Sequence, residues 1–268
     1  MPATQKAAKN AAAPKRAAKA PAPRMTLAET MKALEQAGSA QTCKTYARHG
    51  ATGPMFGVSF ATLKTLVKRI GIDHELALAL WDTGNFDARN LAFKIVDPAQ
   101  ITSAQLDRWA HEASAARMCS GYVGMLAAES PHAATKAEQW AASKNGRERC
   151  AYFALLGHMA SRDLGTPDSF YLTRLSEIER TIHKVPSGER EAMNMAVILI
   201  GCRNASLRKA ATAAAQRIGP VDVDHGDTAC KTPDAAAYIA KTWAHSTGKD
   251  FESPAAHERT RESPRVRC

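Results

Sequence analysis

Two short stretches of this 268-residue sequence hold side chains whose types and spacing could do chemistry. The first contains Asp222, Asp224, His225, Asp227 and Cys230, a set of oxygen, nitrogen and sulfur donors that invites a metal ion. Its spacing matches no standard zinc pattern, and structural zinc sites hold more cysteine or histidine. The sequence therefore predicts no metal there. It favours a polar loop whose aspartate and histidine side chains bond the local backbone and cap the following helix.

The second stretch is basic. Lys144, Arg147 and Arg149 stand together where a predicted helix begins, and Arg208 and Lys209 form another basic pair later in the chain. Arginine side chains beside the N–H groups of a helix N-terminus suit a phosphate group. All of these residues are therefore candidate contacts to a nucleic-acid backbone. The alternative for each is an ordinary solvated helix surface.

The charge of the chain is unevenly distributed. The net charge is +10 with an isoelectric point of about 9.4, and six of the ten charges fall within residues 1–24, which hold no acidic residue. That segment has almost no large apolar side chain to offset its ordering entropy, so a disordered basic arm is predicted. The arm either binds phosphate non-specifically or only keeps the protein in solution. Residues 244–268 are mixed in charge and are predicted to form a flexible polar tail.

Targeting signals and cysteine usage indicate the cellular compartment of the protein. The sequence has no run of about 18 apolar residues, and its basic N-terminus lacks the apolar core of a secretory signal, so no membrane partner is expected. The six cysteines are scattered singly with no CxxC pair, which is typical of reduced thiols in a cytosolic protein. We therefore expect a cytoplasmic protein.

Amphipathic helical segments between residues 25 and 243 must position the candidate residues. In Ser59–Ile70, for example, apolar residues recur at helical spacing and the lysines lie off that face. Each helix pair with its loops takes about 40 residues, the length of a HEAT-like repeat. The sequence thus predicts an all-α fold, a right-handed α-α superhelix (solenoid) of HEAT-like helix pairs. Four tryptophans lie on apolar helix faces and are expected in its core: Trp81, Trp109, Trp140 and Trp243.

Several motifs inside this helical region are similar to those of a known family. The stretches Tyr46-Ala-Arg-His-Gly50 and Gly53-Pro-Met-Phe-Gly-Val58, together with the basic helix that ends at Gly71, resemble the DNA alkylation repair proteins, the AlkD-like HEAT-repeat DNA glycosylases. The string Asp224-His-Gly-Asp-Thr-Ala-Cys-Lys-Thr-Pro-Asp234 resembles one branch of that family. The resemblance extends over most of the chain.

The resemblance implies a DNA glycosylase for positively charged N3- and N7-alkylpurines, with double-stranded DNA as its partner and no metal or cofactor. A nucleoid-associated monomer is the corresponding expectation. In such proteins the concave face of the solenoid holds the duplex by its backbone. An acidic side chain beside aromatic ones stabilises the cationic sugar as the glycosidic bond breaks. On this basis Arg149 matches a family arginine that reaches phosphate, Cys119 matches a family cysteine, and Arg117 directly precedes the site. Tyr122 is a candidate for its aromatic wall.

The expected catalytic carboxylate is replaced. Ser120 stands where the family carries an aspartate, and residues 113–128 contain no acidic side chain. A carboxylate aimed at developing positive charge contributes large rate factors, which a neutral hydroxyl cannot supply. An acidic residue from elsewhere in the chain would restore catalysis if it lay beside Tyr122; the candidates are Asp163, Asp168 and Glu191.

The catalytic residues are therefore left unassigned at this stage, and three functions stay open. The first is excision of alkylated purines. The second is non-catalytic binding of damaged or structured DNA, which the Ser120 replacement favours. The third is a protein-interaction scaffold that uses the same concave surface without DNA.

Overall fold

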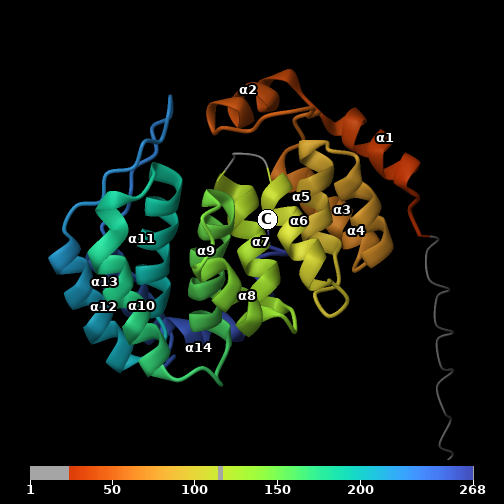
Figure 1. Ribbon diagram of the computed structural model, residues 1–268. Coiled ribbons are helices and arrows are strands. Elements are labelled where there is room, and N and C mark those ends of the chain that lie inside the picture. The colour runs from red at the N-terminus through yellow and green to blue at the C-terminus, as the bar shows by residue number, and fades with distance from the viewer. Residues whose placement is uncertain (1–23, 114–116, 268) are drawn as a thin grey trace, which may run out of the picture.

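The computed structural model describes residues 24–113 and 117–267, with the side chains of residues 117–120 left out. The predicted disordered arm lies outside the described residues apart from Arg24. Within these ranges the regular elements are helices, and one isolated β-bridge joins Gly38 to Val58 (Figure 1). The predicted all-α fold is confirmed. The helices are α1 (Leu27–Ala37), α2 (Ala40–Arg48), α3 (Phe60–Ile70), α4 (His74–Asp82), α5 (Phe86–Ile95), α6 (Ser103–Glu112), α7 (Arg117–Glu129), α8 (Ala133–Ala141), α9 (Gly146–Arg162), α10 (Asp168–Thr181), the short 3₁₀ helix η1 (Ile182–Lys184), α11 (Ser187–Gly201), α12 (Ala205–Ile218), α13 (Ala235–Thr247) and α14 (Pro254–Arg259).

Successive helices form two packed layers that follow a curve (Figure 1). Helix α7 packs against α9, α9 against α11, and α11 against α13, so these helices make a central row. Helices α8 and α12 pack against this row, and α10 packs on both α11 and α12. A helix hides only one stripe of its surface, so stacking in pairs buries a continuous apolar core. No helix in the described part of the chain is both long and apolar enough to cross a membrane.

Local sequence signals set most helix ends. Thr26 and a glutamate in the first turn form a capping box at the start of α1. Gly71 ends α3 with a φ of 72°, a left-handed conformation that glycine adopts at little cost. The hydroxyl of Thr102 accepts the N–H of Gln105 in the first turn of α6, and this helix ends at Glu112.

Two prolines stand just before helices. Pro167 occupies the N-cap position of α10, and Pro131 lies in the turn before α8. Neither is a first-turn residue. A proline has no N–H to donate, so it fits equally well just before a helix.

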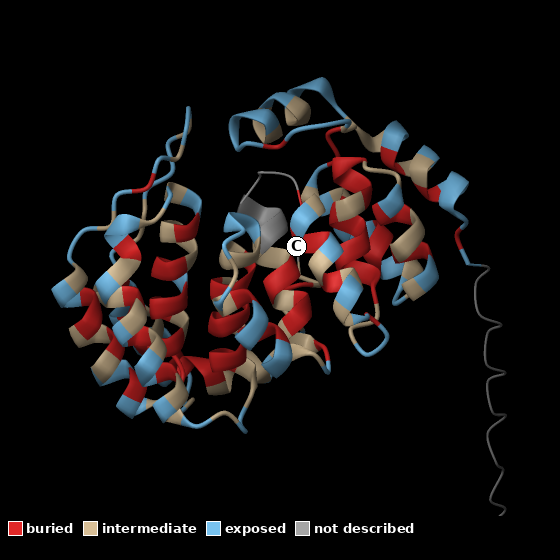
Figure 2. Cartoon of the chain, viewed as in Figure 1, coloured by how far each residue is buried: buried red, intermediate tan, exposed pale blue. Residues whose placement is uncertain are grey.

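All four tryptophans are buried in the core, as predicted. Buried residues occur along most of the packed helices (Figure 2). The rings of Trp81 and Trp109 stack with their centroids 4.2 Å apart, and Phe93 meets both edge-on. Buried aromatic side chains are the largest apolar contributors to a core, and offset or edge contacts are their favoured geometry. The first half of the solenoid is therefore held together around this cluster.

One buried carboxylate fastens the turn-rich segment before α3 to the rest of the fold. Asp87 on α5 has no exposed surface, and its two oxygens accept the backbone N–H groups of Phe56, Gly57 and Val58 at 2.7, 3.0 and 2.8 Å. Gly57 needs its positive φ of 78°, and a Cβ there would lie 2.3 Å from the Ser39 carbonyl oxygen. The family-like motif at this turn thus has a structural role, because it connects the segment before α3 to α5.

The C-terminal segment differs from the predicted flexible tail. Helix α13 continues to Thr247, α14 packs against α9, and the chain then runs back beside α7 (Figure 1). Arg265 is 2% exposed, and its Nε lies 3.0 Å from Glu129 Oε2. The buried ammonium of Lys94 donates to the carbonyl oxygens of Arg265 and Arg267 at 3.1 and 3.0 Å. Buried charges need paired partners. The polar groups of this segment provide such partners inside the fold and are not simply hydrated by solvent.

Candidate nucleic-acid interface

A cavity of about 840 Å³ opens on the central row of helices, between α7, α9 and α11. Small-molecule sites in proteins usually measure about 300–1,000 Å³. Apolar side chains make up most of its wall, among them Tyr122 and Met125 from α7, Phe153 from α9, and Met195 from α11. Pro264 of the C-terminal segment also lines it, so the packed tail is part of its boundary.

Two carboxylates face this cavity, both from the first turns of α11. Glu189 is 8% exposed and Glu191 is half-buried. Their negative field reaches Cys150 on the opposite wall. Burial, followed by these two carboxylates, raises the pKa of the Cys150 thiol to about 11. Cys150 therefore stays protonated at neutral pH and is a poor nucleophile, since the thiolate is the reactive form.

The deep end of the cavity is uncharged. His158 lines it, and burial lowers the pKa of this imidazole from its ordinary 6.5 to about 4, against a smaller opposing effect of Glu129. His158 is therefore neutral at pH 7. His158 therefore adds no positive charge beside the two carboxylates of α11, one of which, Glu189, is paired with Arg149.

This histidine predicts a pH dependence of stability. Between pH 6.5 and pH 4 the unfolded chain binds a proton at His158 that the folded chain does not bind, so stability is lost as the pH falls through this range. The expected loss from this group is about 2 kcal/mol between pH 6.5 and pH 5. Urea denaturation of the wild type and His158→Gln at both pH values measures it. The variant should lose less stability over the interval, and equal losses would contradict the assignment.

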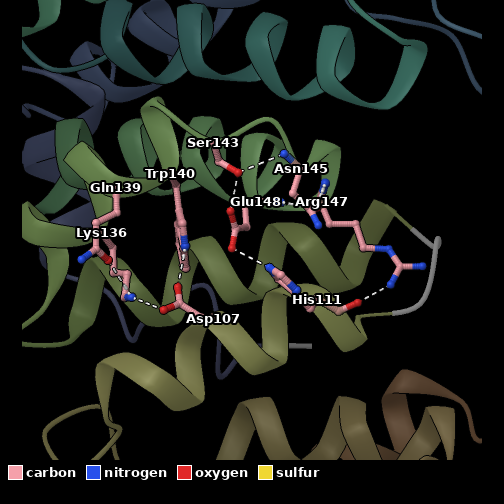
Figure 3. Close-up of polar contacts among 9 residues, drawn as sticks. All are labelled: Asp107, His111, Lys136, Gln139, Trp140, Ser143, Asn145, Arg147 and Glu148. Carbon is pink, nitrogen blue, oxygen red and sulfur yellow. Dashed lines mark hydrogen bonds and ion pairs between the residues drawn. The ribbon is translucent and has the colours of Figure 1, made fainter.

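The mouth of the cavity is basic. Arg147 and Asn145, at the start of α9, line it together with His111 from α6. Arg147 is exposed and donates to the His111 carbonyl, so its guanidinium is held across the gap between α6 and α9 (Figure 3). Lys144, also exposed, directly precedes these residues. Arg147 and Lys144 thus place positive charge at the exposed edge of the cavity.

A network of polar contacts braces this mouth. His111 Nε2 lies 2.6 Å from Glu148 Oε1, and the Ser143 hydroxyl donates to the other oxygen of Glu148 (Figure 3). Farther along, the buried Lys136 ammonium lies 2.7 Å from Asp107, and the indole N–H of Trp140 donates to the same carboxylate at 2.9 Å. These contacts join α6 to α8 and α9, which fixes the position of Arg147.

Arg149 lies beside the cavity and does not line it. Its Nε is 3.0 Å from Glu189 Oε1, and its Nη2 is 3.6 Å from Glu177 Oε1. The guanidinium also sits 4.9 Å from the ring centroid of Phe153. A phosphate would compete with two carboxylates for this side chain. Its contact with DNA stays a prediction, and the structure adds a second role, the orientation of Glu189.

The basic pair on α12 is exposed but separate from the cavity. The Arg208 guanidinium lies over the Trp243 ring, 4.7 Å from its centroid. Lys209 lines a shallow depression that it shares with Glu179 and Arg217. Their contacts with DNA remain predictions.

Of the candidate residues that the family resemblance places in the first turns of α7, only Tyr122 has a described side chain. It lines the cavity. Arg117, Cys119 and Ser120 belong to the first turn of α7, and their side chains lie outside the described part of the structure.

Among the three acidic candidates, the structure brings Glu191 into the cavity that Tyr122 lines. Asp163 instead caps its own turn, accepting the N–H groups of Gly165 and Thr166. Asp168 pairs with Arg203 at 3.5 Å. Sequence reasoning missed Glu189 and His158, because each lies far along the chain from Tyr122 and carries no motif.

The loop that invited a metal ion is braced by polar contacts. His225 Nε2 lies 2.9 Å from the Thr232 hydroxyl, and Asp234 caps α13 by accepting the Ala237 N–H, as expected of a polar loop. No group of three or more potential metal ligands gathers within the described residues. The tip of the loop reaches α2, where a Cβ on Gly226 would lie 3.7 Å from the Arg48 carbonyl oxygen.

Comparison with known proteins shows which family this chain resembles in sequence. Residues 30–239 match the family model of the DNA alkylation repair enzymes. Uncharacterized proteins of Listeria monocytogenes (Lmo0209) and Listeria innocua (Lin0241) are each 26% identical over 214 residues, which covers 78% of this chain and 93% of the relative.

A solved structure extends the likeness to three dimensions. It is described as a member of a new family related to the HEAT-like repeat DNA glycosylases with affinity for branched DNA structures. It superposes with a TM-score of 0.74 at 29% identity and covers 82% of this chain and 95% of that chain. This chain therefore belongs to the DNA alkylation repair enzyme family and has its HEAT-like repeat fold.

Proposed function

We propose that this protein binds DNA at the mouth of the central cavity and prefers branched DNA to a linear duplex, without needing to excise a base. Family membership supports a DNA partner, and the solved relative comes from a family with affinity for branched DNA structures. The observation that carries the proposal is the position of Lys144 and Arg147. Both are exposed at the start of α9, and Arg147 lines the mouth.

The position of the positive charges supports this mode of binding. A phosphate is attracted to the exposed Arg147 and Lys144, whereas the wall of the cavity is mostly apolar. The DNA backbone is therefore expected to run across the mouth and to stay out of the cavity. Contacts of this kind set position and affinity and carry no sequence information.

Removing the two basic side chains tests the proposal. The double variant Lys144→Ala/Arg147→Ala should bind a four-way junction about tenfold more weakly at low salt, because two phosphate contacts are lost. The slope of log affinity against log salt should fall by about two units. Fluorescence anisotropy with a labelled junction and a linear duplex of the same length measures both quantities.

The matched control is Lys68→Ala/Arg69→Ala, which removes the same two charges from the exposed surface of α3. It should leave affinity and salt slope close to the wild type. If both double variants weaken binding equally, the basic mouth is not the binding surface. If the wild type binds no DNA at low salt, the proposed function fails.

Excision of alkylated purines is the second candidate, and one observation favours it. Glu191 and Tyr122 line the same cavity, which puts a carboxylate and an aromatic ring in one site. A carboxylate of this kind can stabilise the positive charge that develops on the sugar. The binding function stands first because the position of the family aspartate is taken by Ser120.

Base release separates the two candidates. Single-turnover release of N7-methylguanine from a defined duplex should be slow for the wild type, and Ser120→Asp should raise it if the backbone already positions that side chain. If Glu191 supplies the carboxylate, Glu191→Gln should lower the wild-type rate about 10²-fold. A wild-type rate equal to spontaneous depurination would eliminate the excision candidate.

A further inference from the structure

The loop between α12 and α13 bridges two distant parts of the solenoid. We call residues 219–234 the strap. Both of its ends are bound to α11, whose first turns line the cavity: Arg190 donates to the Asp222 carbonyl at 2.7 Å, and Asn194 donates to the Pro233 carbonyl at 3.0 Å. The tip projects beyond the packed helices toward the C-terminal end of α2, where a Cβ on Gly226 would lie 3.7 Å from the Arg48 carbonyl oxygen (Figure 1).

Hydrogen bonds within the strap hold its tip in shape. His225 Nε2 lies 2.9 Å from the Thr232 hydroxyl, which joins the two legs of the strap. Thr228 donates its N–H to the Gly226 carbonyl at 2.8 Å and its hydroxyl to the His225 carbonyl at 2.9 Å. Gly226 has a φ of 62°, which glycine adopts at little cost. A preformed tip loses little conformational entropy when it contacts α2.

The strap and α2 carry opposite charges. Helix α2 holds the exposed Lys44 and Arg48 and no acidic residue. Arg48 and His49 line a shallow depression together with Asp227 and Cys230 of the strap. Opposite charges favour this contact, and the same basic side chains also attract phosphate. The charged residues of the strap are four aspartates and one lysine: Asp222, Asp224, Asp227, Asp234 and Lys231.

We propose that the strap is an autoinhibitory cover, which occupies the basic end of α2 in the free protein and leaves it when DNA binds. The inference rests on the DNA binding proposed above and names a control of that binding. Strap aspartates and DNA phosphates compete for the same basic side chains, so the closed form binds DNA weakly. With the strap open in about one tenth of the free molecules, the apparent affinity is lowered about tenfold.

Two variants separate the length of the strap from its charge. Replacing residues 225–230 with Gly-Asp-Gly shortens the strap but keeps its net charge, because Asp227 is the one acidic or basic residue removed. Asp222→Asn/Asp227→Asn keeps the length and removes two charges. In fluorescence anisotropy at low salt, both variants should bind a four-way junction about tenfold more tightly than the wild type. The matched control, Glu75→Gln/Glu252→Gln, removes two exposed carboxylates outside the strap and should bind like the wild type.

Limited trypsin digestion tests the cover without DNA. Trypsin cleaves after arginine, and the Arg48 carbonyl that the tip of the strap contacts belongs to such a bond. Cleavage of a transiently opened segment follows the population of its open form. The short-strap variant should therefore be cleaved after Arg48 about tenfold faster than the wild type. Cleavage after the exposed Arg69, at the end of α3, should keep its rate.

The outcomes separate this inference from the proposed function. An unchanged rate of cleavage after Arg48 would show that the strap does not cover α2, which overturns the inference. Tighter DNA binding by the charge variant alone would show simple repulsion and would overturn it as well. Unchanged junction affinity in both variants overturns the inference and leaves the proposed function standing. If no protein of the set binds the junction, the proposed function fails and the inference fails with it.

Discussion

Replacing Asp87 with alanine should lower the free energy of unfolding by about 4–5 kcal/mol, the lower end of what three hydrogen bonds to a charged group contribute at about 1.5–3 kcal/mol each. The carboxylate is fully buried and accepts three consecutive backbone N–H groups, from Phe56 to Val58. Alanine would leave these donors without an acceptor inside the fold. Buried donors without partners carry the full cost of their lost hydration.

Urea denaturation followed by circular dichroism measures this effect. Asp87→Asn keeps one acceptor oxygen and should fall between the wild type and Asp87→Ala. The matched control is Asp82→Ala, which removes an exposed carboxylate that pairs with Arg108 at 2.9 Å. Exposed ion pairs contribute about 0–1 kcal/mol, so this control should change little. Equal losses of stability in Asp82→Ala and Asp87→Ala would show that the hydrogen bonds of Asp87 do not stabilise the fold.

Replacing Arg265 with alanine should cost about 3–5 kcal/mol, the usual effect of breaking a buried ion pair by removing one partner. Arg265 is almost fully buried against Glu129, and its guanidinium also donates to the Phe93 carbonyl. Its loss would leave Glu129 without this partner. It would also loosen the chain whose carbonyl oxygens hold the buried Lys94 ammonium.

The control for Arg265 lies four residues earlier. Arg261 has a side chain that is 53% exposed and a long 3.8 Å contact to Glu258, so Arg261→Ala should cost less than about 1 kcal/mol. Thermal and urea denaturation of the two variants make the comparison. If both arginines prove dispensable, the C-terminal segment is not part of the cooperative fold.

Sequence alone determined the helices and most of their boundaries, because the signals for them are local. Apolar spacing within one segment defines a helix face, and a residue such as Thr26 or Gly71 ends or begins a helix through its own backbone and side chain. The burial of the four tryptophans followed from the same spacing. The family resemblance added the HEAT-like arrangement, since it reports on the whole fold.

Only the tertiary structure decided which carboxylates pair with which arginines. Arg149 and Arg265 look alike in the sequence, yet one is held between Glu189 and Glu177 and the other is buried against Glu129. These partners lie on other helices, and residue type does not reveal which distant carboxylate will neutralise an arginine. For the same reason, the sequence predicted a flexible tail for residues 244–268, although this segment packs against α7 and α9.

The residues around the cavity were likewise not predictable as a group from the sequence. Tyr122 was a candidate from its motif, and Glu191 was one of three acidic residues that could have joined it. The packing of α11 against α9 and of α9 against α7 brought Glu191 to the cavity, while Asp163 and Asp168 were taken up by local and interhelical contacts. A local pattern specifies a helix, but the face that one helix shows to another depends on crossings that the pattern does not contain.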